Sequence, residues 1–334
     1  MRVSVVGAGV MGLAAARALA QRGHVVTVYE QFELHHTRGS SHGASRIFRL
    51  SYTDEYWIRL AQRAYELWRQ LERESGRQLL VPHGLLDVEA DVGPRLAAFD
   101  ATSVAYEKLI PSEARDRFGV AYDDAPALVF TADAGITLAE DAVDSFAAGA
   151  RAAGAEIRER SRVDALADVP GDCVVVTAGG WAPKLFDAGG LELEAWPTRE
   201  TVAYFAGPAI PSLIDTLEGQ EYFALTAPGI GVKAGIHQSG KPTEPDDDPD
   251  PDEEVVTRAS DWIARRLPQV DPVPLRAETC IYTNVDQNRF VCERRGRYVV
   301  GSACSGHGFK FAPAVGELLA ELASAGNAAR FPRG

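Results

Sequence analysis

Three glycines near the N-terminus have the spacing of a loop that binds phosphate groups. Gly7, Gly9 and Gly12 form the pattern GxGxxG. In this pattern the first glycine permits a tight turn, the second lets the backbone approach a pyrophosphate, and the third lets a helix pack closely on a strand. Glu30 follows at a spacing that suits an acid bound to a ribose hydroxyl. These residues predict a dinucleotide site and disfavour NADP, but they do not distinguish FAD from NAD.

The cysteines give no sign of a metal site. None is part of a CxxC pair or stands near a histidine, so we expect no bound metal and reduced thiols. By residue type alone, each is interpreted as a core thiol. The four are Cys173, Cys280, Cys292 and Cys304.

The elements around the glycine loop have the order of a βαβ unit. Residues 2–6 predict a strand, 10–22 a helix ended by Gly23, and 24–30 a second strand. The apolar run 173–177 is typical of a parallel strand buried on both faces. Further helices are expected at 55–74, 140–152, 255–266 and 312–325. Further strands are expected at 84–89, 155–159, 199–205, 221–226, 230–236, 277–282 and 297–301.

Composition restricts the partners. The net charge of −13 argues against nucleic acid or an anionic membrane as the main partner. No apolar run reaches the roughly 20 residues that span a bilayer. The N-terminal run is interpreted as a strand rather than a signal peptide, which predicts a cytoplasmic protein. Residues 241–254, rich in proline and acidic side chains, predict a solvated loop.

Three further motifs follow the glycine loop. They are GSSHGASRIFR at 39–49, GVKAGIH at 231–237, and CIYT at 280–283 followed by SGHGFKF at 305–311. In this order, from end to end of the chain, they resemble the monomeric sarcosine oxidase group of the D-amino-acid-oxidase-like flavoproteins. The resemblance implies an FAD-dependent amine oxidase that converts a small secondary α-amino acid, such as sarcosine, to the imine. It also implies that O2 is reduced to H2O2.

The resemblance implies cofactor contacts along the whole chain. Cys280 occupies the position at which this family forms a thioether to the flavin, so the resemblance implies covalent FAD, with a buried thiol as the alternative. The remaining implied cofactor contacts, beside Gly7, Gly9, Gly12 and Glu30, are His42, Arg46, Val163, Gly306, His307, Gly308, Phe309 and Lys310.

The resemblance also implies a substrate pocket. Arg49 and Lys310 match a pair that binds the substrate carboxylate, for which a planar fork and a point charge are suited. His237 would orient the amine or bias its protonation. Lys233 would lie over the flavin and promote its reaction with oxygen. Surface ion pairs for Arg49 and Lys310, and a packed stem for Lys233, are the alternative interpretations.

Other implied pocket residues are His42, Arg46 and Tyr282, while Tyr222 suits the pocket and the core almost equally. Three departures from the family put the substrate in doubt: the chain is shorter, residues 241–254 have no obvious counterpart, and Ser41 replaces a histidine.

We therefore expect an α/β fold with a Rossmann-like FAD-binding domain and a second domain built on an antiparallel sheet. The FAD-binding domain is expected at 1–85, 132–196 and 272–334, and the substrate-binding domain at 86–131 and 197–271. A monomer is expected, with an amino acid and O2 as its small-molecule partners.

Two rival functions remain. An NAD-dependent dehydrogenase or imine reductase would use the same glycine loop but give Cys280 no role. A non-catalytic flavin-binding protein would not bring Lys310, Arg49 and His237 together.

Overall fold

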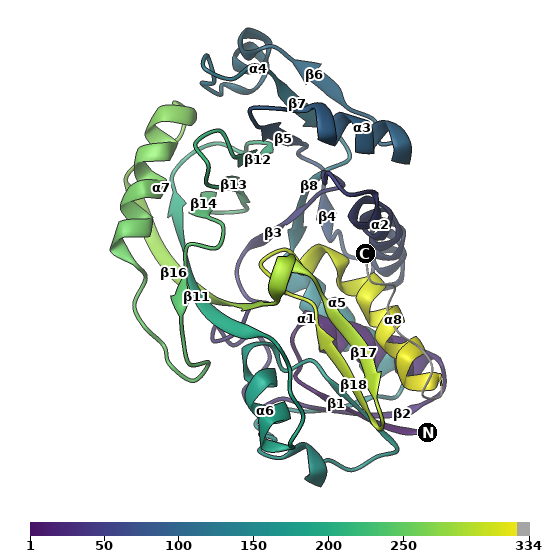
Figure 1. The fold of residues 1–334 in the computed structure, drawn as a ribbon. Coiled ribbons are helices and arrows are strands. Elements are labelled where there is room, and N and C mark those ends of the chain that lie inside the picture. Colours follow the sequence, from purple (N-terminus) through teal and green to yellow (C-terminus); the bar gives the residue numbers. More distant parts are fainter. Residues whose placement is uncertain (326–334) are drawn as a thin grey trace.

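The computed structural model describes residues 1–325, and two large sheets dominate it (Figure 1). The N-terminal residues form the predicted βαβ unit: β1 (Arg2–Val6), α1 (Val10–Gln21) and β2 (Val25–Tyr29). They belong to a six-stranded sheet with the order β17-β18-β10-β1-β2-β9. All neighbours in this sheet are parallel except β17 and β18. The bounds of the other strands are β9 Glu156–Arg158, β10 Cys173–Val176, β17 Val291–Arg295 and β18 Tyr298–Ser302.

Helices cover both faces of the six-stranded sheet. Val3 and Val5 of β1 share a core with α1, α5 (Ala139–Ala152) and α8 (Ala312–Ser324). Val174 and Val176 of β10 point to the other face, where Phe186 of α6 (Ala182–Ala188) packs. All four residues of β10 are buried, as the apolar run predicted for a central parallel strand.

The second sheet has nine strands and is mostly antiparallel. Its order is β15-β11-β14-β13-β12-β5-β7-β6, and β16 pairs with β11 on a side branch. Only β5 and β12 run parallel. The bounds are β5 Leu85–Val88, β6 Glu107–Leu109, β7 Leu128–Thr131, β11 Trp196–Phe205, β12 Ser212–Asp215, β13 Tyr222–Ala227, β14 Gly231–Ile236, β15 Lys241–Pro242 and β16 Pro274–Asn284.

One face of this sheet packs against α7 (Glu253–Arg266), which lies along its outer side in Figure 1. Successive side chains of a strand point to opposite faces. Val232, Ala234 and Ile236 of β14 therefore share a core with Trp262 of α7, and the alternate residues of the same strand face the inside of the molecule.

A small sheet and a long helix complete the fold. β3 (Ser45–Phe48), β8 (Gly135–Leu138) and β4 (Leu80–Val81) form the small sheet in that order. α2 (Glu55–Ser75) begins at the side-chain cap of Asp54, which accepts from Tyr56 N, and ends at the left-handed Gly76. Two shorter helices, α3 (Gly93–Thr102) and α4 (Pro111–Phe118), lie beside the nine-stranded sheet (Figure 1).

All helices and strands expected from the sequence are present within a few residues of their expected bounds. The expectations missed several short elements: β3, β4, β6, β7, β8, β12, β15, β17, α3, α4 and α6. Residues 326–334, which end the expected 272–334 range, lie outside the described part. Within residues 1–325, no helix has the length and apolar character needed to cross a membrane.

Candidate active site

A cavity of about 340 Å³ lies between the two large sheets. The residues predicted for the site line it, with the exception of Gly12 and of Tyr222, for which the pocket was one of two options. Gly12 instead lets α1 pack closely against the loop. A Cβ at this position would lie 1.9 Å from Gly7 O, so a residue with a side chain would not fit. The sequence predictions therefore converge on one cavity, and Lys310, Arg49 and His237 share it.

The glycine loop forms one end of the cavity. Glu30 at the end of β2 holds this loop in place, since its Oε2 accepts a hydrogen bond of 2.8 Å from Ala8 N. Ser41 Oγ accepts a hydrogen bond of 3.0 Å from Val10 N at the start of α1. The serine that departs from the family pattern thus stabilises the start of the helix that follows the glycine loop. That role had no signal in the sequence, because residues 10 and 41 meet only in the folded chain.

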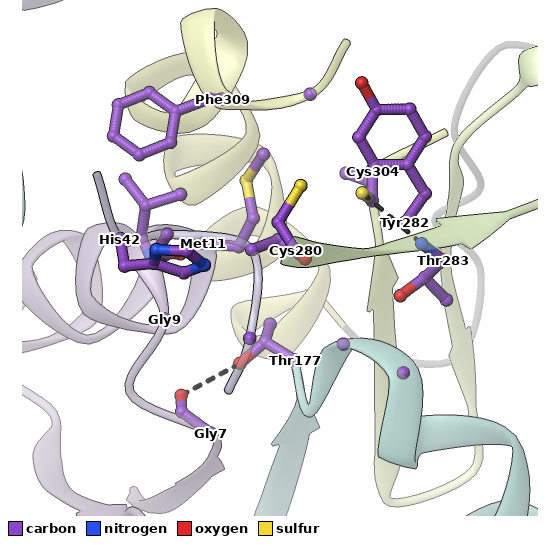
Figure 2. A pocket seen from close by; sticks show the side chains of 18 of the residues that line it. Gly7, Gly9, Met11, His42, Thr177, Cys280, Tyr282, Thr283, Cys304 and Phe309 are labelled. Atoms are coloured by element: carbon purple, nitrogen blue, oxygen red, sulfur yellow. Dashed lines mark hydrogen bonds between the residues drawn. The ribbon is translucent and has the colours of Figure 1, made fainter. Parts of the chain in front are cut away.

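Alternate residues of β14 and β16 form the wall that faces this loop. Lys233 of β14 is 4% exposed, and its Nζ donates to Ser45 O over 2.5 Å. Burial, together with the charge of Arg46, lowers its pKa to about 7. Cys280 of β16 points into the same space, which His42, Met11 and Phe309 also line (Figure 2). Burial raises the pKa of its thiol to about 11, against the opposing charges of Arg46 and Lys233.

Arg46 organises the loop that covers this wall. Its guanidinium donates to Ser40 O over 3.0 Å and to His42 O over 2.5 Å. It also lies over the ring of Phe309, 5.8 Å from the centroid. Burial, with Arg46 nearby, lowers the pKa of His42 to about 4, so this imidazole is neutral near pH 7.

The opposite end of the cavity carries two basic side chains on separate elements. Arg49 follows β3 directly, and Lys310 lies in the 3-10 turn Phe309–Phe311. Tyr52 lies between them, with Arg49 Cζ at 4.6 Å and Lys310 Nζ at 5.7 Å from its ring centroid. Burial alone would lower the pKa of Arg49, but the charges of Tyr52 and nearby acids outweigh it and raise this pKa. For Lys310, burial and the charge of Arg49 both lower the pKa, to well below its usual range. Lys310 Nζ donates to His307 O over 2.6 Å.

The remaining predicted residues line the cavity around these groups. His307 contacts Tyr52, with 3.3 Å between its Nδ1 and the hydroxyl, and Asn288 O, at 2.9 Å from its Nε2. Val163 lies in the loop after β9. Tyr282 of β16 faces His237, which follows β14, and their ring centroids are 5.6 Å apart.

Tyr222 does not lie in the cavity. Its ring stacks on Trp262 at 5.5 Å and is 7% exposed, on the face of β13 that packs against α7. The alternation of the strand turns Glu221 and Phe223 into the cavity instead. The pocket option for Tyr222 is therefore wrong, and the sequence analysis missed both neighbours.

A second carboxylate that was missed is Glu278, two residues before Cys280. It lines the wall and accepts from Tyr204 Oη over 2.5 Å. Its charge opposes the lowering of the pKa of Lys233 and of His42.

The acidic segment, residues 241–254, was expected to be a solvated loop, but its first two residues form β15 and its last two begin α7. The residues between them are largely exposed, and they are also anchored beside the glycine-loop end. Trp181 Nε1 donates to Asp246 Oδ1 over 2.7 Å, and Arg162 lies 3.4 Å from the same carboxylate. Arg38 donates to the backbone of Asp246 over 2.5 Å. Trp181 and Arg162 both line the cavity, so the expectation of a simple solvated loop was incomplete.

The cavity suits FAD in its chemistry. It joins the glycine loop to a wall that carries a thiol and a lysine. His42 Nε2, in the loop that covers this wall, is buried and has no hydrogen-bond partner in the described chain. Such an orphaned polar atom calls for a polar ligand.

Known proteins are similar to this chain over nearly its whole length. A family model described as FAD dependent oxidoreductase (DAO) matches residues 2–322. Monomeric sarcosine oxidase of Streptomyces avermitilis is 31% identical, with 98% of this chain and 94% of that protein covered. Human peroxisomal sarcosine oxidase is 29% identical, with 95% and 90% covered. The open form of NikD, an unusual amino acid oxidase essential for nikkomycin biosynthesis, has a TM-score of 0.86 and 28% identity, with 96% and 93% covered.

Proposed function

Because the chain belongs to the family of FAD-dependent oxidoreductases, we propose that it oxidises a small secondary α-amino acid, N-methylated or cyclic, to the imine. One observation carries this proposal: Arg49 and Lys310 line the same cavity as Lys233 and Cys280. Arg49 and Lys310, called the clamp below, and the wall of β14 and β16 that carries Lys233 and Cys280, called the flavin wall below, thus face the same cavity. The similarity to sarcosine oxidases supports the same substrate class. Family membership does not favour the NAD-dependent alternative.

Bound FAD would supply two-electron redox chemistry, with uptake of a hydride equivalent from the carbon next to the substrate nitrogen and return of the electrons to O2, which would give H2O2. The glycine loop and Glu30 would hold the dinucleotide, with the pyrophosphate at the positive end of α1. His42, Arg46 and Phe309 would contact the flavin. We propose a thioether from Cys280, because its thiol points into this part of the cavity.

The clamp would fix the substrate by its carboxylate. Arg49 supplies a permanent charge and a planar pair of donors. Burial beside Arg49 lowers the pKa of Lys310, and the charge of a bound carboxylate would raise it again, because an opposite charge favours the charged form.

The other residues would position and tune rather than react. Burial lowers the pKa of His237, so its ring is neutral at pH 7 and can orient a neutral amine. Lys233 would place a cation beside the flavin, where it stabilises negative charge that develops as oxygen is reduced. Such positioning reduces the barrier by fixing reactants in one geometry.

Several finer features belong to the same proposal. We propose that residues 1–85, 132–196 and 272–334 form the FAD-binding domain and that 86–131 and 197–271 form the substrate-binding domain, with β16 reaching from the first group into the sheet of the second. The clamp residues Arg49 and Lys310 come from the first group. We also propose a cytoplasmic monomer. Size-exclusion chromatography with light scattering tests the monomer.

The decisive experiment is anaerobic reduction of the purified flavoprotein. Sarcosine, L-proline, L-pipecolate and N-methyl amino acids are each added, and bleaching of the flavin absorbance is followed. At least one should bleach the flavin, and air should restore the colour with formation of peroxide. A flavin that no secondary amine reduces would overturn the proposal.

A further inference from the structure

Glu221 is a carboxylate inside the substrate end of the cavity, and the clamp does not use it. It directly precedes β13, and its carbonyl accepts a hydrogen bond of 2.8 Å from His237 N. These two residues are therefore cross-strand neighbours. Because the alternation of β13 buries Tyr222 against α7, the Glu221 side chain lies on the opposite face and lines the cavity.

The position of Glu221 is at the clamp rather than at the flavin wall. Its charge acts on Arg49, Lys310, Tyr52 and His237. On the flavin wall, the carboxylate that acts on Lys233 and His42 is Glu278. Glu221 is thus the acid that lines the cavity beside the clamp, and Glu278 is the acid that lines it on the flavin wall.

Glu221 is not tied to the cations of the clamp. Within residues 1–325, no ion pair joins it to Arg49 or Lys310. The acids just behind the clamp differ, since Arg95 lies 2.6 Å from Glu89 and 3.5 Å from Asp87. Those carboxylates are neutralised by a protein partner, while Glu221 faces the space that the substrate occupies.

Resting on the proposed function, we propose that Glu221 selects a secondary α-amino acid that carries a second, cationic group. The substrate carboxylate lies on Arg49 and Lys310, and its additional ammonium or guanidinium group lies on Glu221. A charge-assisted hydrogen bond in a cavity shielded from water is stronger than one at the surface. A neutral side chain would leave the carboxylate without a partner.

The test compares two ligands of the same shape. L-lysine methylated on its α nitrogen carries a terminal ammonium, and N-methyl-L-2-aminoheptanoate carries a methyl group at the same position of a side chain of equal length. The wild type should bind the lysine derivative at least about 10-fold more tightly. The dissociation constants come from anaerobic calorimetric titration of photoreduced protein, whose flavin cannot accept electrons, so binding is measured whether or not the ligand is a substrate.

Glu221→Gln keeps the shape and removes the charge, and it should abolish the preference. Glu218→Gln is the matched control: this exposed residue on the same turn pairs with Arg265, and its replacement should leave the preference intact. Equal binding of the two ligands by wild type, or an unchanged preference in Glu221→Gln, would overturn the inference. If no secondary amine reduces the flavin, the proposed function fails, and the titrations still decide the role of Glu221.

Discussion

Tyr282 and His237 approach each other across the backbone of Gly306. A Cβ at Gly306 would lie 2.2 Å from Tyr282 Cε2 and 2.5 Å from His237 Cε1. Gly306 also has a φ of +74°, a backbone conformation that residues other than glycine rarely adopt. The glycine is therefore required both by its conformation and by the two rings, which reach the cavity from different strands.

Gly306→Ala should displace one of these rings and lower kcat/KM for the best secondary amine about 100-fold, because small displacements of positioned groups are costly in catalysis. Steady-state kinetics measures the effect. Gly229→Ala is a control for the positive φ alone, since nothing lies within 4 Å of its Cβ position. Equal losses in the two variants would contradict a role for ring placement.

Cys280→Ala should release the flavin on acid precipitation. Wild-type protein is expected to give a yellow, fluorescent pellet, and the variant a colourless pellet with the flavin in the supernatant. Cys304→Ala is the matched control, because this thiol lines the same cavity but accepts a hydrogen bond from Thr283 N at 3.5 Å. Colour retained by Cys280→Ala would exclude this attachment point.

Lys310→Met should raise KM for sarcosine-type substrates by about 10-fold or more, since a hydrogen bond to a charged group is lost. A secondary amine without a carboxylate should be unaffected by the change. Lys241→Met, at an exposed pair with Asp252, is the control. If KM for the amine without a carboxylate rose equally, the clamp would be disproved.

Oxidation of the reduced flavin by O2 should slow as the pH rises through about 7. The pKa of Lys233 is lowered to about 7, so its positive charge is present below this pH and lost above it. Stopped-flow mixing of photoreduced enzyme with O2 measures the rate. Lys233→Met should lower the rate about 100-fold or more and remove the pH dependence, while Lys233→Arg should keep the rate at high pH. A flat wild-type profile would contradict this role.

The local parts of the fold were predictable because their signals are local. The glycine spacing and the βαβ order at residues 2–30 follow from short-range patterns. Strands such as β4, with two residues, carry too few side chains to show a period. Glu221 was missed because its position depends on the pairing of β13 with β14. The sequence could not assign Tyr222 to the pocket or to the core, because the face of β13 that is buried is known only from the packing of this strand against α7.

The anchoring of the acidic segment was hidden for the same reason. Its composition predicts exposure, which is largely observed, but the hydrogen bond from Trp181 to Asp246 joins residues 65 positions apart. Long-range contacts of this kind have no signature in one sequence.

β16 pairs with β11 in the nine-stranded sheet, and the chain passes from its end at Asn284 to β17 in the six-stranded sheet. Cys280 thus belongs to one sheet, and the glycine loop belongs to the other. A cofactor bound by the loop and bonded to Cys280 would therefore link the six-stranded sheet to the nine-stranded sheet covalently at one end and noncovalently at the other. The two halves of the molecule would then resist mechanical separation through the cofactor itself, as well as through their packed side chains.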